Sequence, residues 1–96
     1  MNPREIVLLQ GAQSDLLAIF AGRGERVYHE VDKALGILRV FPEITPVHFG
    51  RSIRRLVVAK TTLGIFYSFT GNRVLVGAIL DLRQSPRAIK KRLEGL

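Results

Sequence analysis

Residues 53–93 read IRRLVVAKTTLGIFYSFTGNRVLVGAILDLRQSPRAIKKRL. Short runs rich in β-branched and aromatic residues predict three strands, at residues 56–58, 65–69 and 74–82. Gly71-Asn72 lies between the last two runs, where glycine accepts the positive φ of a tight hairpin turn. Ser85-Pro86 predicts the start of a helix, because serine caps a helix N-terminus and proline suits its first turn. Ile89 and Leu93, four residues apart, can dock that helix.

The third predicted strand is apolar on both sides. Strict alternation places five residues on one face (Val74, Val76, Ala78, Leu80 and Leu82) and Leu75 and Ile79 on the other. A strand that is apolar on both faces is central in its sheet, or its outer face is covered by something else.

The first half of the chain predicts one strand and two helices. Residues 5–10 form an apolar run that Gly11 ends, which is typical of a strand. A short helix is expected over residues 13–20, a break over 21–24, and a longer helix over 25–41. The longer helix has one apolar stripe, made of Val27, Val31, Ala34, Leu35, Leu38 and Phe41. Pro42 ends it, and residues 43–52 are expected to be a loop.

These elements predict one α+β domain spanning residues 1–96. We expect a twisted, mainly antiparallel sheet of four strands, with two N-terminal helices packed on one face and a short C-terminal helix.

The charge is concentrated in the second half of the chain. Residues 1–50 carry five basic and six acidic side chains, whereas residues 51–96 carry ten basic and two acidic ones, a net charge of +8. A clustered basic surface indicates a polyanionic partner such as RNA, DNA or an acidic protein segment. The alternative is a surface that is simply solvated.

Several kinds of site find no support in the sequence. There is no cysteine, and His29 and His48 lack the spacing of metal ligands, so we expect no metal site and no cofactor. Gly22-Arg23-Gly24 lacks the pattern of a phosphate-binding loop. No motif for Ser/His/Asp catalysis accompanies Asp15, Asp32 or Asp81. No membrane-spanning run and no signal peptide are found, which favours a cytoplasmic protein.

Arginine and lysine remain as candidates for chemistry. Fixed guanidinium groups can stabilise the charge that develops on phosphate during metal-free RNA cleavage. Residues on or beside the predicted strands that could do this are Arg54, Arg55, Lys60, Arg73 and Arg83. Of the two tyrosines that could act as an acid or base, Tyr67 is expected to pack in the sheet and Tyr28 to lie on the surface.

Four segments, in this order, resemble the RelE/ParE superfamily of type II toxin-antitoxin toxins, also called plasmid stabilization proteins. They cover residues 38–43 at the end of the long helix, 53–58, 64–67 before the hairpin, and 79–86 running into the last helix. The resemblance spans essentially the whole chain and implies a small toxin that a cognate antitoxin neutralises in a toxin-antitoxin hetero-oligomer.

The superfamily has two modes of action. RelE-like members are ribosome-dependent mRNA endonucleases, and the resemblance places Arg83 on one of their functional arginines. Two other functional positions fall on Gly64 and Ile89, which carry no suitable group. These departures favour the ParE-like mode, inhibition of DNA gyrase by binding.

Three hypotheses therefore remain. The favoured one is a ParE-like gyrase inhibitor. The second is a ribonuclease that acts on mRNA at the ribosome, with a site made of Arg83, Arg54, Arg55 and Lys60. The third is a non-toxic module that only binds the antitoxin. The expected binding surface for antitoxin or target comprises Arg73, Arg83, Arg87, Lys90, Lys91 and Arg92.

Overall fold

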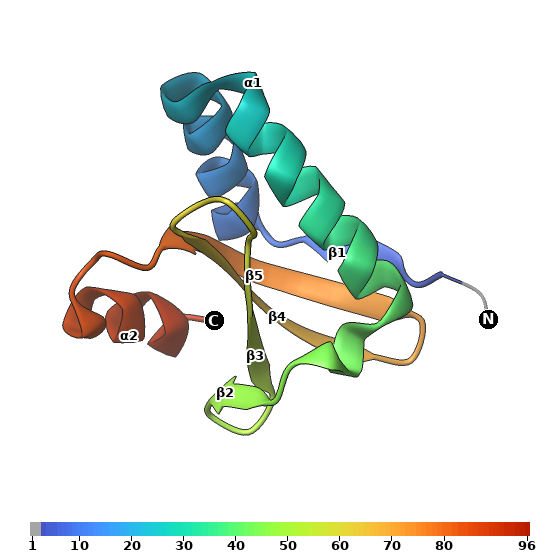
Figure 1. Ribbon diagram of the computed structural model, residues 1–96. Helices are drawn as coiled ribbons and strands as arrows, with labels where there is room; N and C mark the ends of the chain where they lie inside the picture. The colour runs from blue at the N-terminus through green and yellow to red at the C-terminus, as the bar shows by residue number, and fades with distance from the viewer. Residues whose placement is uncertain (1–2) are drawn as a thin grey trace.

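The computed structural model describes residues 3–96 and contains one mixed sheet, one bent helical element and one short helix (Figure 1). The elements in chain order are β1 (Glu5–Leu8), α1 (Gln10–Val40), the 3-10 turn η1 (Pro42–Ile44), β2 (Val47–Phe49), β3 (Ile53–Val57), β4 (Leu63–Thr70), β5 (Arg73–Asp81) and α2 (Pro86–Glu94). The strand order is β1-β5-β4-β3-β2. Only the β1–β5 pair is parallel, and the other neighbours are antiparallel.

The α+β class is confirmed, but the number of strands is not. The sheet has five strands, because β2 lies inside the stretch that the sequence assigned to a loop. This strand is only three residues long, and its pairing with β3 is irregular between Val47 and Phe49. Pro46 and Gly50 flank it, so its sequence has the composition of a loop.

The two expected N-terminal helices form one helical element, α1, that is bent at Gly24. A straight helix of 31 residues would be about 46 Å long. The longest dimension of the molecule is 35 Å, so the helix must fold back. Gly24 has φ 84° and ψ −177°, a conformation that suits glycine. The chain reverses there into a first arm (residues 10–23) and a second arm (residues 25–40), both on one face of the sheet (Figure 1).

The core consists of two clusters on opposite faces of the sheet. On one face, buried residues of α1 such as Val31 and Leu38 pack against Ile65 and Val76. On the other face, the buried residues are Phe66, Ala78, Leu80 and Leu93, with Phe49, Ile53, Leu82 and Ile89 packed around them. The helix α2 contributes to the second cluster only.

A β-bulge at Gly77 redistributes the side chains of β5. Phe66 pairs with Ala78 but Tyr67 pairs with Val76, so Gly77 has no partner on β4. One extra residue moves every later side chain to the opposite face. Val74, Val76 and Ile79 therefore join the α1 cluster, whereas Ala78 and Leu80 join the α2 cluster. The expectation that residues 74, 76, 78, 80 and 82 share one face was wrong for this reason.

Tyr67 packs in the sheet, as the sequence predicted, and is 1% exposed. Its hydroxyl donates a hydrogen bond to the Pro42 carbonyl oxygen at 2.7 Å and lies 2.8 Å from the Thr45 hydroxyl. Burial raises the pKa of the phenol, so the neutral form is held. These bonds fix η1 against β4.

We expect Tyr67→Phe to lower the free energy of unfolding by about 1–2 kcal/mol, because the Pro42 carbonyl and the Thr45 hydroxyl both lose a partner. Urea titration followed by circular dichroism measures the change. Tyr28→Phe, which removes a hydroxyl from a ring that is 36% exposed, should change stability by less than about 0.5 kcal/mol. Equal losses in the two variants would show that the Tyr67 bonds add nothing specific.

Candidate protein-interaction face

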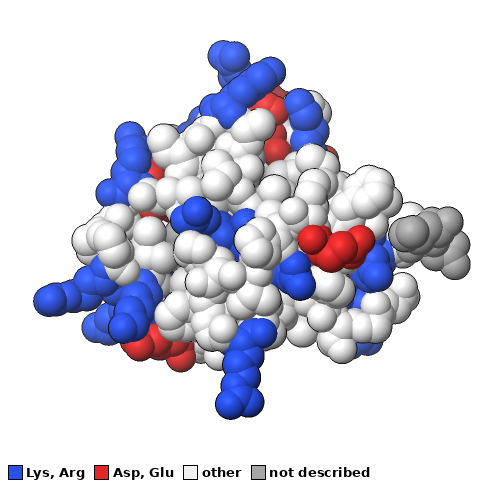
Figure 2. Space-filling model, turned by 60° about the horizontal axis from the view of Figure 1, so that its bottom comes forward, with Lys and Arg blue, Asp and Glu red and all other residues white. Residues whose placement is uncertain are grey.

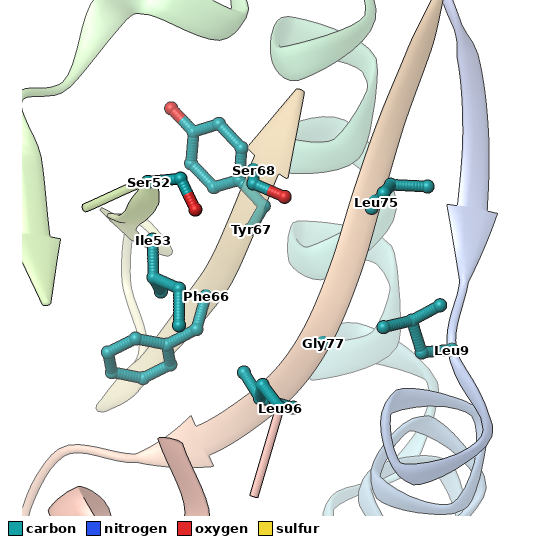
Figure 3. Close-up of a pocket in the computed structure, with 9 residues that line it drawn as sticks. All are labelled: Leu9, Ser52, Ile53, Phe66, Tyr67, Ser68, Leu75, Gly77 and Leu96. Atoms are coloured by element: carbon teal, nitrogen blue, oxygen red, sulfur yellow. The ribbon is translucent and has the colours of Figure 1, made fainter. Parts of the chain in front are cut away.

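The face of the sheet opposite α1 is only partly covered, and we call it the open face. The helix α2 packs on it through Ile89 and Leu93. Beside α2 lies a hollow of about 250 Å³ (Figure 3). Its lining residues are Leu9, Ser52, Ile53, Phe66, Tyr67, Ser68, Leu75, Gly77 and Leu96. Most of these side chains are apolar, so the hollow is suited to an apolar side chain of a partner.

The bulge at Gly77 also shapes this hollow. A Cβ atom at position 77 would lie 2.7 Å from Cδ1 of Leu96. The missing side chain therefore leaves the space that Leu96 fills, and the Leu96 side chain forms part of the wall.

A second hollow, of about 550 Å³, lies where α2 meets β2 and β3. Its lining residues are His48, Phe49, Arg55, Phe66, Leu82, Gln84, Pro86, Ile89, Lys90 and Leu93. It combines an apolar floor with two cations, Arg55 and Lys90. The ring of His48 lies 6.0 Å from that of Phe66. Partial burial, and then the charge of Arg55, lower the pKa of His48, so its neutral form is favoured near neutral pH.

Cations border the open face on the side of α2. Figure 2 shows blue side chains gathered at the left, the side on which α2 lies in Figure 1, beside white surface that single blue and red groups interrupt. The exposed basic residues of this region are Arg83, Arg87, Lys90, Lys91 and Arg92. Arg92 and Arg83 are engaged in ion pairs, with Asp15 and Asp81 respectively. Within residues 3–96, no ion pair is found for Arg87, Lys90 or Lys91, so these three can meet an acidic partner.

The sheet separates the candidate ribonuclease residues. Arg54 and Arg55 are successive strand residues and point to opposite faces. Arg54 donates a hydrogen bond to the Thr45 carbonyl oxygen, and its guanidinium lies 5.2 Å from the centre of the Phe69 ring. Arg55 lines the second hollow. Lys60 lies in the turn between β3 and β4, with φ 63°.

Arg83 and Arg73 are both paired with acids. Arg73 Nε lies 3.3 Å from a Glu5 carboxylate oxygen, and both side chains are exposed. Arg83 donates to Asp81 through Nη2 at 2.7 Å and through its backbone N–H at 2.9 Å. Asp81 also accepts a hydrogen bond from Arg23 of the first arm. The contacts with Arg83, first of all, hold the pKa of Asp81 well below its usual range.

The low pKa of Asp81 predicts a loss of stability in acid. A carboxylate whose folded-state pKa is depressed stabilises the fold above its unfolded pKa of about 3.9, and this contribution is lost as the pH falls further. The thermal midpoint of the protein should fall on acidification from about pH 5 to pH 3. Circular dichroism should show a shallower fall for Asp81→Asn. Glu94→Gln, at an exposed position, is the control and should keep the wild-type slope.

Asp15 joins three elements next to the open face. Its carboxylate accepts hydrogen bonds from the Arg92 guanidinium of α2 at 2.8 and 3.1 Å. It also accepts the backbone N–H of Ile79 in β5 at 3.0 Å. Because β1 ends at Leu8, this N–H lies beyond the strand that pairs with the first part of β5. The side chain of Asp15 thus satisfies a sheet donor and holds α2 in place.

Sequence reasoning missed two contributors to this face. His48 lies in the stretch 43–52 that was expected to be a loop, because β2 was not recognised. Gly77 falls inside the strand predicted over residues 74–82, for which no bulge was expected. An isolated glycine in a strand is a known sign of a bulge, so that signal was available. For His48 the local sequence contains no such signal.

Comparison with known proteins places the fold. No family model and no curated protein matches the sequence. Among solved structures, a chain of the chromosomal ParDE toxin-antitoxin system from P. aeruginosa matches with a TM-score of 0.64 at 13% identity. The match covers 79% of this chain and 92% of that one.

The fold is ParE-like. The resemblance noted in the sequence is thereby confirmed for the fold. No helix in residues 3–96 is both long and apolar enough to cross a membrane. In the same residues, no three His, Asp or Glu side chains are grouped as metal ligands would be.

Proposed function

We propose that this chain is the toxin of a type II toxin-antitoxin pair, that a cognate antitoxin neutralises it, and that it inhibits DNA gyrase in the cytoplasm. The observation that carries the proposal is the fold shared with a chain of a ParDE toxin-antitoxin system over 92% of that chain. Fold alone does not determine function, so the distribution of charge and chemistry must agree with it.

The open face supports an antitoxin as the partner. Its hollows offer apolar contacts, and Arg87, Lys90 and Lys91 border it with unpaired charge. A segment that orders on binding, with apolar anchors and acidic side chains, would complement both features. Arg73, Arg83 and Arg92 are already paired with acids, so we assign them a smaller share of this binding.

The placement of the arginines supports inhibition by binding rather than by catalysis. A site for RNA cleavage needs several groups aimed at one phosphate. Here the Arg54 and Arg55 side chains lie on opposite faces of the sheet, and the Arg83 guanidinium is engaged by Asp81. A gyrase inhibitor needs no such convergence.

Two assays test the proposal. Controlled expression in a bacterial host should arrest growth, and purified protein should inhibit supercoiling by DNA gyrase and trap its cleavage complex. Topoisomerase I, assayed in parallel, should be unaffected. Growth arrest without any effect on gyrase would exclude gyrase as the target. Normal growth would exclude both toxin hypotheses and leave the non-toxic binding module.

The antitoxin surface is tested by rescue. The proposal predicts a small open reading frame beside the gene, and coexpression of its product should restore growth. Lys90→Glu combined with Lys91→Glu should weaken that rescue, because the acidic partner would meet like charge. Lys60→Glu, an exposed lysine in the turn between β3 and β4, is the matched control.

One observation favours a second candidate, the ribosome-dependent endoribonuclease. The second hollow brings together Arg55, Lys90 and His48, whose neutral ring could accept a proton. If the protein cleaves mRNA, toeprinting on translating ribosomes should show cleavage that His48→Ala and Arg55→Ala abolish. Arg54→Ala should retain it, because Arg54 lies on the other face.

A further inference from the structure

The first arm of α1 exposes apolar side chains on the outside of the molecule, away from the open face. Leu17 is 73% exposed and Phe20 is 51% exposed. The Phe20 ring packs edge-to-face against Tyr28 of the second arm, with 5.2 Å between ring centres. A groove of about 510 Å³ lies here, and its lining residues are Leu8, Gln13, Leu16, Leu17, Phe20 and Tyr28. We call this surface the arm groove.

The arm groove is also nearly free of charge. Residues 10–22 contain a single charged residue, Asp15, and it is paired with Arg92. A helix that faces only water normally carries charged residues on its outer side. Contiguous exposed apolar surface marks protein-interaction sites, and charged residues are depleted at the core of such interfaces.

We propose that the arm groove is where a second copy of this chain docks, first arm against first arm about a twofold axis. Leu17 projects from the surface that also holds the groove, so each copy offers a side chain to insert and a place to receive it. A twofold interface requires this self-complementarity. Ser14 and Ala21, which lie near Leu17 around the helix, are small and exposed, which lets two arms approach closely.

Electrostatics favours a second copy over an acidic partner at this surface. Each chain carries a net charge of +7, but the net charge of residues 1–50 alone is −1. The lining of the arm groove holds no charged side chain, so two copies that meet there bring no like charges of the lining together. An acidic segment would find its cations at α2 instead. A stable interface covers roughly 800 Å² per partner, about an eighth of the 6184 Å² surface of this chain.

The test is the mass of the purified protein in solution as a function of concentration. Sedimentation equilibrium and light scattering, over about 1–200 µM, should show a monomer–dimer equilibrium. Leu17→Glu should weaken it at least tenfold, because a twofold interface contains the substituted residue twice. Val57→Glu changes an exposed apolar residue of β3 that is 52% exposed, and should leave the equilibrium unchanged. Leu17→Gln replaces the same side chain without adding a charge, so it serves as a second variant if Leu17→Glu fails to fold. Circular dichroism checks that each variant is folded.

The outcomes are decisive and do not depend on toxicity. A monomer at every concentration overturns the proposal, as does a dimer that Leu17→Glu does not weaken. Cell-free synthesis supplies protein whether or not the chain arrests growth. The dimer proposal can therefore fail while the gyrase proposal holds, and the reverse.

Discussion

Phe66→Ala is expected to lower the free energy of unfolding by about 3–5 kcal/mol. Phe66 is fully buried in the cluster between the sheet and α2, and it lines both hollows of the open face. That cluster has only four buried members, so the cavity would leave Leu93 with few apolar contacts. The amide hydrogens of α2 should then exchange faster than those of the sheet strands, a difference that hydrogen-exchange mass spectrometry resolves.

Leu38→Ala is the matched control for this prediction. Leu38 is equally buried, but in the cluster on the α1 side of the sheet. It should cost about 2–5 kcal/mol in global stability without a selective loss of protection in α2. If both variants loosen α2 alike, the two faces of the sheet do not behave as separate clusters.

Asp15→Ala is expected to cost about 2–3 kcal/mol, because it leaves the backbone N–H of Ile79 without a partner and releases Arg92. Asp15→Asn keeps an acceptor for that N–H and should cost less. Denaturant unfolding curves, fitted with one common slope of free energy against denaturant concentration, compare the stabilities of the variants.

Arg92→Met separates the two roles of Asp15. It removes the ion pair with α2 and leaves the bond to Ile79 in place. Because the Arg92 side chain is 41% exposed, its pair with Asp15 should contribute no more than about 1 kcal/mol. A loss in Arg92→Met as large as that in Asp15→Ala would mean that the ion pair, and not the capped sheet donor, holds this corner together.

The elements that the sequence predicted well have local causes. The hairpin between β4 and β5 follows from Gly71-Asn72, and Gly71 has the expected positive φ of 54°. The helix α2 begins where Ser85 accepts the Ala88 N–H at 3.1 Å. The helix break near residues 21–24 follows from Gly24. Each of these signals is read within a few residues.

The parts that were missed depend on pairing between distant segments. The strand β2 exists because β3 offers it an edge, and nothing within its three residues indicates that. The bulge at Gly77 is defined only by the register with β4.

The site follows the same division. The basic character of the second half could be counted from the sequence, and the unpaired cations of α2 agree with it. The sequence could not tell which arginines form ion pairs, because Arg83 and Arg92 contact acids whose positions the fold determines. The opposite orientation of Arg54 and Arg55 was implied by strand alternation, but only once the strand was known to include both.

The parallel pair of β1 and β5 has a consequence for the synthesis of the protein. Glu5 pairs with Arg73 and Leu8 with Val76, so the first strand to leave the ribosome has to wait for the last one. Pairings between such distant segments form late, because a long loop must close before they gain contacts. Until residues 73–76 emerge, α1 has no complete sheet to cover. The open face therefore does not exist on the nascent chain, and a partner that recognises it can engage only after β5 has been made.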